Sequence, residues 1–227
     1  MTAATSTLQV SEIFSSIQGE STRAGLPCTF VRLAGCNLQC RWCDTPYARQ
    51  GGSSMTVREI IEQVAKAGLS LTEVTGGEPL LQEGTLDLLR GLLEGSTEVM
   101  LETNGSLDIS VVPGNVIRII DIKCPGSGMH EHMMMSNLDD LRATDELKFV
   151  IADRADYDWA RTFVEHDKRC LQAGAIHFVP VIRSAGEQDA GLQAHQLADW
   201  MLSDPGLPKV RLSTQLHKLI WGPDTRR

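Results

Sequence analysis

The sequence has no apolar segment long enough to cross a lipid bilayer. Its longest apolar run, residues 116–122, contains an arginine and is far shorter than the about 20 residues of a membrane-spanning helix. The first ten residues are rich in Thr and Ala and have no basic start, unlike a secretory signal peptide. We therefore expect a cytoplasmic protein that has no membrane partner.

The chain also has fewer basic residues than acidic ones. The chain has 21 Lys and Arg against 29 Asp and Glu, which gives a formal net charge of -8. A chain with this excess of negative charge is a poor electrostatic match to the phosphate backbone of DNA or RNA. We therefore expect no nucleic-acid partner.

Internal repeats, low-complexity tracts and Pro/Ser-rich linkers are absent as well. The composition of the 227 residues, 42% hydrophobic and 22% charged, is that of an ordinary globular protein and excludes disorder as the main state. No feature of the sequence marks a domain boundary. We therefore interpret residues 1–227 as a single domain.

Strand-like segments alternate with amphipathic helices along most of the chain. The pattern predicts strands at residues 28–33, 71–74, 99–102, 116–122, 147–151, 176–182 and 210–212, and helices at 57–67, 79–93, 156–173 and 188–202. This succession is typical of α/β proteins in which right-handed βαβ units build a parallel sheet. Six or seven strands are fewer than the eight of a closed barrel, so we predict an incomplete, open (β/α) barrel rather than a doubly wound sheet.

Polar and glycine-rich clusters follow the first four predicted strands. They are, in order, Cys36-Cys40-Cys43, Thr75-Gly76-Gly77-Glu78, Thr103-Asn104-Gly105-Ser106, and Lys123 with Ser127. In parallel α/β folds, ligands bind at the carboxyl ends of the strands. The sequence therefore predicts one functional face that carries all four clusters.

Three of the six cysteines form a Cys-x3-Cys-x2-Cys motif, Cys36, Cys40 and Cys43. In a reducing compartment such a cluster indicates a metal site before a disulfide. A [4Fe-4S] cluster needs a ligand on each of its four irons, so three cysteines leave one iron open. The alternative is a structural zinc site completed by a histidine, although zinc prefers paired Cys-x2-4-Cys elements and the nearest histidine in sequence is His130.

The cysteine motif, with Trp42 directly before its last cysteine, resembles the cluster-binding signature of the radical S-adenosylmethionine superfamily. By itself, Gly76-Gly77-Glu78-Pro79 indicates only a tight turn between strand and helix. Beside the cysteine motif, it resembles the superfamily element that contacts the methionyl group of S-adenosylmethionine. The resemblance implies a radical SAM type of incomplete barrel, a [4Fe-4S] cluster, S-adenosylmethionine bound to the open iron, and an external one-electron reductant.

A finer resemblance is to the 7-carboxy-7-deazaguanine synthase family, and it extends over nearly the whole chain. Its marks are sequence blocks in the same order, at residues 12–14, 17–20, 30–38, 43–45, 102–106 and 215–218. The resemblance implies a homodimeric lyase that converts a small pterin, 6-carboxy-5,6,7,8-tetrahydropterin, to 7-carboxy-7-deazaguanine with loss of ammonia. This is a step toward queuosine and other 7-deazapurines, and Mg²⁺ assists it.

The family resemblance also implies roles for individual residues. The substrate would be bound by Ile17, Gln18, Gly19, Arg32, Thr75 and Pro223, and Mg²⁺ by Thr45. S-adenosylmethionine would be surrounded by Trp42, Cys43, Asp44, Gly77, Asp121, Ile122, Lys123, Val179, Pro180, Val181 and Ile182. Some family members close the substrate pocket with the carboxylate of a terminal proline, whereas here four residues follow Pro223.

Two other functions remain open from the residues alone. Glycyl-radical activating enzymes also carry Cys-x3-Cys-x2-Cys, but they act on a protein and need a docking surface for it. A noncatalytic binding module stabilised by zinc is the other alternative. The blocks at residues 17–20 and 215–218 match a small-molecule pocket, so we favour the pterin enzyme.

Overall fold

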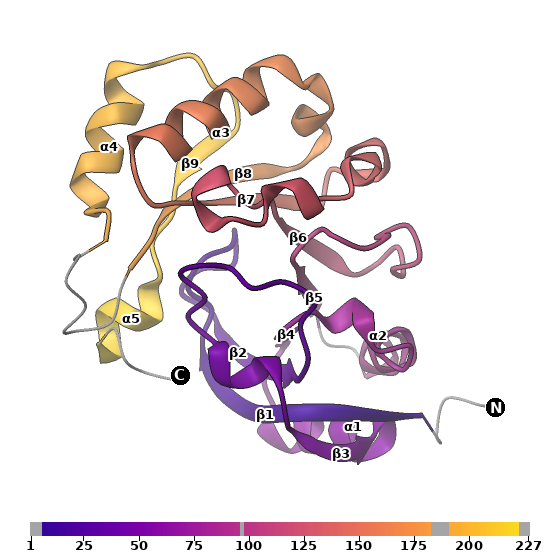
Figure 1. Ribbon diagram of the computed structural model, residues 1–227. Coiled ribbons are helices and arrows are strands. Elements are labelled where there is room, and N and C mark those ends of the chain that lie inside the picture. The colour runs from indigo at the N-terminus through magenta and orange to yellow at the C-terminus, as the bar shows by residue number, and fades with distance from the viewer. Residues whose placement is uncertain (1–5, 96–97, 183–190, 223–227) are drawn as a thin grey trace.

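The computed structural model describes residues 6–95, 98–182 and 191–222. Its frame is a curved sheet with the strand order β3-β1-β2-β4-β5-β6-β7-β8-β9 (Figure 1). From β2 onward each neighbouring pair is parallel, through strands β2 (Pro27–Leu33), β4 (Leu71–Gly76), β5 (Glu98–Thr103), β6 (Ile117–Asp121), β7 (Glu146–Ile151), β8 (Ala175–Pro180) and β9 (Val210–Leu212). Among the described residues, β3 and β9 are unpaired edges, so the predicted open barrel is confirmed.

Two further strands were not predicted. β1 (Thr7–Ile17) pairs antiparallel with β2, and β3 (Ser53–Thr56) pairs antiparallel with β1. Because β1 runs opposite to β2, the loop from Gln18 to Leu26 lies at the amino-terminal ends of the parallel strands. There its backbone is held by hydrogen bonds from Gln18 N to Leu26 O and from Gly25 N to Gln18 O.

The helices cover the outer face of the sheet in two groups (Figure 1). Helices α1 (Val57–Ala67) and α2 (Thr85–Glu94) pack with β2, β4 and β5 around one apolar core. Helices α3 (Arg154–His166) and α4 (Ala194–Ser203) pack with β6 to β8 around another. No helix in these described segments is both long and apolar enough to span a membrane.

The predicted helix boundaries are right for α1 and wrong for three others. The Thr56–Glu59 capping box and the left-handed Gly68 delimit α1 as expected. The helix predicted at 79–93 starts only at Thr85, because Pro79–Leu81 forms a separate 3-10 turn that Glu78 caps. The helix predicted at 156–173 starts at Arg154 and is broken at Asp167, where a 3-10 turn begins.

The fourth predicted helix, 188–202, begins at Ala194, and residues 188–190 lie outside the described part of the chain. A short helix, α5 (Leu216–Trp221), was not predicted. It follows β9 and contacts β1, so it lies between the two ends of the sheet. One backbone bond, from Leu216 N to Gly19 O at 3.4 Å, joins it to the β1–β2 loop.

The two-residue period of the strands separates an apolar outer face from a charged inner face. On β4 to β7, outward residues such as Val74, Leu101, Ile120 and Leu147 belong to the two outer cores. The residues that alternate with them point inward, and four charged side chains among them, one from each strand, line the cavity: Glu73, Glu102, Asp121 and Lys148. Four consecutive strands therefore bring charge to one place.

One buried ion pair supports the outer face of β6. The Arg118 guanidinium is fully buried, lies 3.1 Å (Nε) from an Asp145 carboxylate oxygen, and donates to the Ile109 and Asp140 carbonyls. Removing one member of a buried pair leaves the other charge uncompensated. The pair thus ties β6 to the segments before and after it.

We expect Arg118→Leu to lower the free energy of unfolding by about 3–5 kcal/mol, because Asp145 then has no cation in a buried site. Denaturant unfolding followed by circular dichroism measures this change. The control is Arg58→Ala, which removes an exposed pair with Glu62 on α1 and should leave the unfolding midpoint unchanged. Equal effects of the two substitutions would contradict the interpretation.

Candidate functional site

A cavity of about 190 Å³ opens at the carboxyl ends of the parallel strands and extends into the barrel. Its walls come from the β1–β2 loop, the loop after β2, the ends of β4 to β8, and α5. The four polar clusters predicted to share one face do converge at this end of the sheet. Ser127 itself fixes the loop after β2, because its carbonyl accepts a hydrogen bond from Arg41 N at 3.1 Å.

Most of the predicted site residues line this cavity. They are Ile17, Gln18, Gly19, Arg32, Cys36, Cys40, Trp42, Cys43, Asp44, Thr45, Thr75, Gly77, Asp121, Lys123, Pro180, Val181 and Ile182. Ile122 packs into the outer core beside α3, and Val179 is buried without lining the cavity. Pro223 lies outside the described residues.

The three cysteines lie on the loop of residues 35–52, here called the cysteine loop. This loop is in close backbone contact with the turn after β4. Gly77 N donates to Leu33 O at 3.1 Å and Glu78 N to Gly35 O at 2.7 Å. A Cβ on Gly77 would collide with the Gly35 carbonyl, so only glycine fits. The glycine pair is therefore required by the neighbouring backbone, before any ligand is considered.

The carboxylate of Glu78 fixes the same turn to the end of β5. It is fully buried and accepts hydrogen bonds from Thr103 Oγ1 at 2.8 Å and from Asn104 N at 2.7 Å. The Asn104 amide in turn donates to Asn37 Oδ1 at 3.0 Å in the cysteine loop. Three strand ends are thus joined by short polar bonds around the cysteines.

The three motif cysteines are free and half-buried, and all three line the cavity. Burial raises the pKa of Cys40, and the nearby Lys123 charge partly offsets that effect. Three thiols that line one cavity can bind three irons of a [4Fe-4S] cluster and leave the fourth iron open.

The other cysteines lie away from the cavity. Cys28, Cys124 and Cys170 are each buried in an apolar environment. Burial raises the pKa of all three thiols, that of Cys170 to about 12, so they stay protonated at neutral pH. This agrees with their interpretation as small packing residues.

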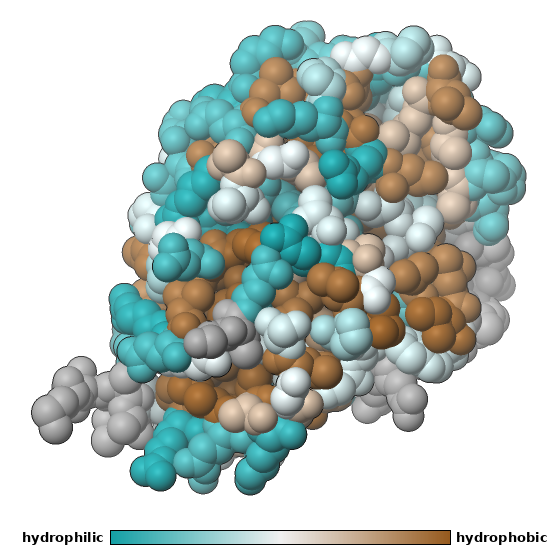
Figure 2. Space-filling model, turned by 180° about the vertical axis from the view of Figure 1, so that it is seen from behind, coloured by the Kyte–Doolittle hydropathy of each residue, from teal (hydrophilic) through white to brown (hydrophobic). Residues whose placement is uncertain are grey.

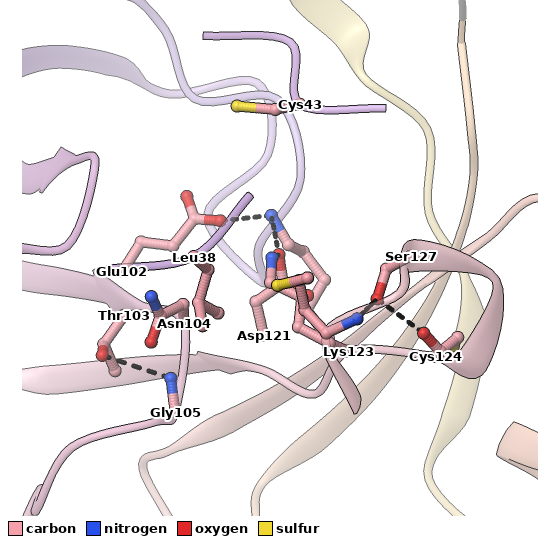
Figure 3. A network of polar contacts seen from close by, with 12 residues as sticks. Leu38, Cys43, Glu102, Thr103, Asn104, Gly105, Asp121, Lys123, Cys124 and Ser127 are labelled. Atoms are coloured by element: carbon pink, nitrogen blue, oxygen red, sulfur yellow. Dashed lines mark hydrogen bonds and ion pairs between the residues drawn. The ribbon is translucent and has the colours of Figure 1, made fainter. Parts of the chain in front are cut away.

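Six charged side chains form the inner end of the cavity, here called the charged floor: Glu20, Glu73, Glu102, Asp121, Lys123 and Lys148. The Lys148 ammonium pairs with Glu102, and lies 3.5 Å from Glu20 and 3.7 Å from Asp121. Burial lowers the pKa of Lys148, but attraction to these carboxylates outweighs burial and holds the pKa well above its usual value. Figure 3 shows Glu102, Asp121 and Lys123 close together, with Cys43 on the loop beside them.

Residue-level sequence reasoning did not assign Glu20, Glu73, Glu102 or Lys148 to the site. Glu20 and Glu102 were noticed only as parts of sequence blocks, and Glu73 and Lys148 were missed. The available signal was a single charged residue inside an otherwise apolar strand, because a buried charge needs a partner. Only β4 shows that signal, since β5, β6 and β7 each contain two charged residues.

A second polar group forms the wall between the cysteine loop and α5. The Asp44 carboxylate lies 3.5 Å from Lys218 Nζ and accepts a hydrogen bond from Gln215 Nε2 at 3.3 Å. Burial raises the pKa of Asp44, but Lys218, Lys148 and Arg32 together lower it below the usual value. The wall thus holds a carboxylate that stays ionised.

His217 stands beside the β1–β2 loop in this wall. A Cβ on Gly19 would lie only 2.7 Å from His217 Nδ1, so the two residues are in close contact. Burial and the Lys218 charge lower the pKa of His217 to about 4, which makes its ring neutral at pH 7. The blocks at residues 17–20 and 215–218 therefore meet in one wall.

Arg32 and Thr45 both line the cavity, but they differ in how their side chains are held. Arg32 Nε donates to Glu12 Oε1 at 2.8 Å, and the same oxygen accepts a bond from Tyr47 OH, so the guanidinium is held in place. Thr45 precedes the 3-10 turn Pro46–Arg49 but its side chain makes no capping hydrogen bond there. Its hydroxyl lies 3.9 Å from Cys43 Sγ, at the cavity.

Comparison with known proteins gives one family model and full-length relatives. The model described as the Radical SAM superfamily matches residues 31–121. The chain is 43% identical over 226 residues to a 7-carboxy-7-deazaguanine synthase of Koribacter versatilis, covering 96% of this chain and 99% of that protein. It is 47% identical over 223 residues to one of Chlorobaculum tepidum, covering 96% of each chain.

Solved structures share the fold at lower sequence identity. The crystal structure of QueE from Escherichia coli has a TM-score of 0.70 and 19% identity, and covers 92% of this chain and 94% of that chain. Streptococcus suis SuiB bound to its precursor peptide has a TM-score of 0.59, with 79% of this chain and 46% of that chain covered. At these identities, the likeness establishes the barrel architecture.

We expect Cys36→Ala, Cys40→Ala and Cys43→Ala each to prevent stable iron binding, because a cube held by two thiolates lacks a further ligand. Iron and sulfide content after anaerobic reconstitution measures the effect. Cys170→Ala is the control, because this buried thiol lies outside the cavity, and it should retain the full iron content. Normal iron in any of the first three variants would remove that cysteine from the cluster.

Proposed function

The chain belongs to the 7-carboxy-7-deazaguanine synthase family of radical S-adenosylmethionine enzymes, and we propose that it converts 6-carboxy-5,6,7,8-tetrahydropterin to 7-carboxy-7-deazaguanine with release of ammonia. The observation that carries the proposal is that the cysteine loop and the blocks at residues 17–20 and 215–218 line one cavity. A pocket built from these three segments suits a small molecule next to a cluster.

Family membership implies a [4Fe-4S] cluster and S-adenosylmethionine as cofactors. Cys36, Cys40 and Cys43 would hold the cluster, which would supply the one-electron chemistry that generates a radical from S-adenosylmethionine. The electron comes from an external one-electron reductant. Around the cofactor, the chain provides Trp42, Asp44, Gly77, Asp121, Lys123, Pro180, Val181 and Ile182.

The chain's own charges orient the pterin. Arg32, fixed by Glu12, offers a planar pair of donors that suits the substrate carboxylate. Thr75 lies beside Arg32 as its register partner on β4, and Ile17, Gln18 and Gly19 line the same cavity. In this arrangement the carboxylate-rich floor faces the donor-rich ring of the pterin.

Mg²⁺ is assigned to Thr45. Its hydroxyl makes no capping bond to the turn that follows it, although this turn begins with Pro46. A hydroxyl oxygen is a suitable ligand for a hard cation that keeps its other positions for substrate and water. The cation would then link Thr45 to oxygen atoms of the substrate.

The active form in this proposal is a homodimer of single-domain chains. One continuous sheet, β3 to β9, supports the single domain. Apolar side chains gather on parts of the rear surface (Figure 2), and Leu219, Ile220 and Trp221 of α5 are exposed. Exposed apolar side chains of this size favour contact with another subunit.

An anaerobic assay tests the reaction. The reconstituted protein is incubated with dithionite, S-adenosylmethionine and 6-carboxytetrahydropterin, and the product is followed by mass. We expect 7-carboxy-7-deazaguanine in large excess over 5′-deoxyadenosine, because the cofactor is regenerated in each turnover. Formation of 5′-deoxyadenosine without this product would refute the proposed reaction, and equal amounts of the two would refute cofactor regeneration.

We expect Thr45→Val to lose most of the rate increase that Mg²⁺ gives to chelator-treated enzyme. The substitution keeps the shape but removes the ligand oxygen, and a misplacement of the substrate by about 1 Å can lower the rate about 100-fold. The measurement is a titration of rate against Mg²⁺, with iron content determined in parallel. Thr162→Val on the exposed face of α3 is the control, and superimposable titrations for all three proteins would remove Thr45 from the metal site.

A further inference from the structure

Among the described residues, Glu73 is the one carboxylate of the charged floor that forms no ion pair. It lies on the inner face of β4, only 2% exposed, between the β1–β2 loop and β5. The ion pairs of the described residues include Glu20, Glu102 and Asp121 but not Glu73. A carboxylate this deeply buried without a cation is unfavourable in its ionised form.

The charges around Glu73 indicate where a proton resides. The floor has four carboxylates but only two ammonium groups, Lys148 and Lys123, and Lys123 is engaged by Asp121 at 2.7 Å. Burial and repulsion from Glu102 hold the pKa of Glu73 well above its usual value, and attraction to Lys148 offsets this only in part. Burial, the lack of an ion pair and the nearby carboxylates all favour the protonated form of Glu73.

The amide of Gln18 determines which oxygen of Glu73 carries the proton. Gln18 Oε1 accepts a hydrogen bond from Glu20 N at 2.8 Å, so the amide nitrogen must point the other way. That nitrogen, Nε2, donates to Oε2 of Glu73, which is thereby occupied as an acceptor. The proton is left on Oε1, and the carboxyl is hydrogen-bonded to Glu102.

Glu102 is the member of this pair that reaches the substrate space. Its side chain is 22% exposed and lines the cavity at the end of β5, whereas Glu73, two residues away in register on β4, lines the same cavity but is only 2% exposed. Lys148 forms an ion pair with Glu102. Its positive charge compensates the negative charge that Glu73 and Glu102 hold between them. A proton can thus move from a buried donor to a carboxylate that faces the cavity.

We propose that Glu73 and Glu102 share one proton and deliver it to the nitrogen that leaves the substrate as ammonia. When the carbon–nitrogen bond breaks, its electron pair goes to nitrogen. The proton held by Glu73 passes to Glu102 and from Glu102 to that nitrogen, which leaves both carboxylates ionised beside Lys148. The ring carbon then loses a proton as the five-membered ring becomes aromatic, and this proton returns to the pair. Substrate gives product and ammonia with no net consumption of protons. The proposal rests on the proposed function.

Glu73→Gln tests the acid directly. The amide has the same shape, accepts from Gln18 and donates to Glu102, but it has no transferable acid proton. We expect kcat to fall at least about 100-fold, a typical contribution of general acid catalysis, with KM within about threefold. With substrate deuterated at C6, deuterium should still appear in recovered S-adenosylmethionine, because hydrogen abstraction precedes ammonia loss.

The pH profile separates an acid from a packing residue. The groups that face Glu73 are Gln18 and Glu20 from the β1–β2 loop, Cys28 from β2, Glu102 from β5 and Lys148 from β7. Since the pKa of Glu73 is raised, its proton is retained at neutral pH and lost as the pH rises through that value. The native enzyme should lose activity in an alkaline limb that Glu73→Gln lacks.

Two further variants complete the experiment. Glu98→Gln, at an exposed pair with Arg23, should match the native enzyme in every measurement. If Glu73→Gln does not fold, as judged by iron content and circular dichroism, Glu102→Gln should show the same loss of ammonia release with deuterium transfer retained. Native kcat and pH profile in Glu73→Gln, or loss of deuterium transfer together with product, would overturn the proposal. Absence of product from the native enzyme would instead refute the proposed function.

Discussion

The interior of the barrel depends on the ion pairs that a single ammonium group, that of Lys148, makes with the carboxylates around it. Its partners come from three parts of the chain: Glu102 at the end of β5, Asp121 at the end of β6, and Glu20 in the β1–β2 loop. A buried lysine is tolerated only when carboxylates replace the water that it loses. The strands, the loop under them and the cavity above them are therefore held to one arrangement by the same charge.

The parallel strands could be predicted because they are covered on both faces and their sequences are mostly apolar. β1 could not, since it alternates apolar and polar residues irregularly and its register shifts between Val10 and Glu12. The start of α2 was missed because Leu80 and Leu81 continue its leucine pattern, although Glu78 caps a separate turn there. At six residues, α5 is too short to display a helical period.

The cysteine loop and the glycine turn could be located from spacing, because their chemistry depends on residues close in sequence. Glu73 and Lys148 could not, since their significance arises between strands. The sheet register places Asp121 opposite Lys148, and no pattern within β6 or β7 alone shows that pairing. Likewise, the hydrogen bond from Gln18 to Glu73 joins residues 55 positions apart. Local sequence shows that a charge is buried, whereas only the fold shows what neutralises it.

Helix α5 supplies His217 and Lys218 to the cavity, yet none of its residues belongs to the apolar cores. The apolar packing of the sheet and its helices does not include α5, which is attached by contacts to β1 and the β1–β2 loop and by the ion pair of Lys218 with Asp44. Substitutions in this helix can accumulate with little penalty to the scaffold. This makes α5 the wall of the cavity where a substitution can change which ligand fits while the packing of the sheet stays as it is.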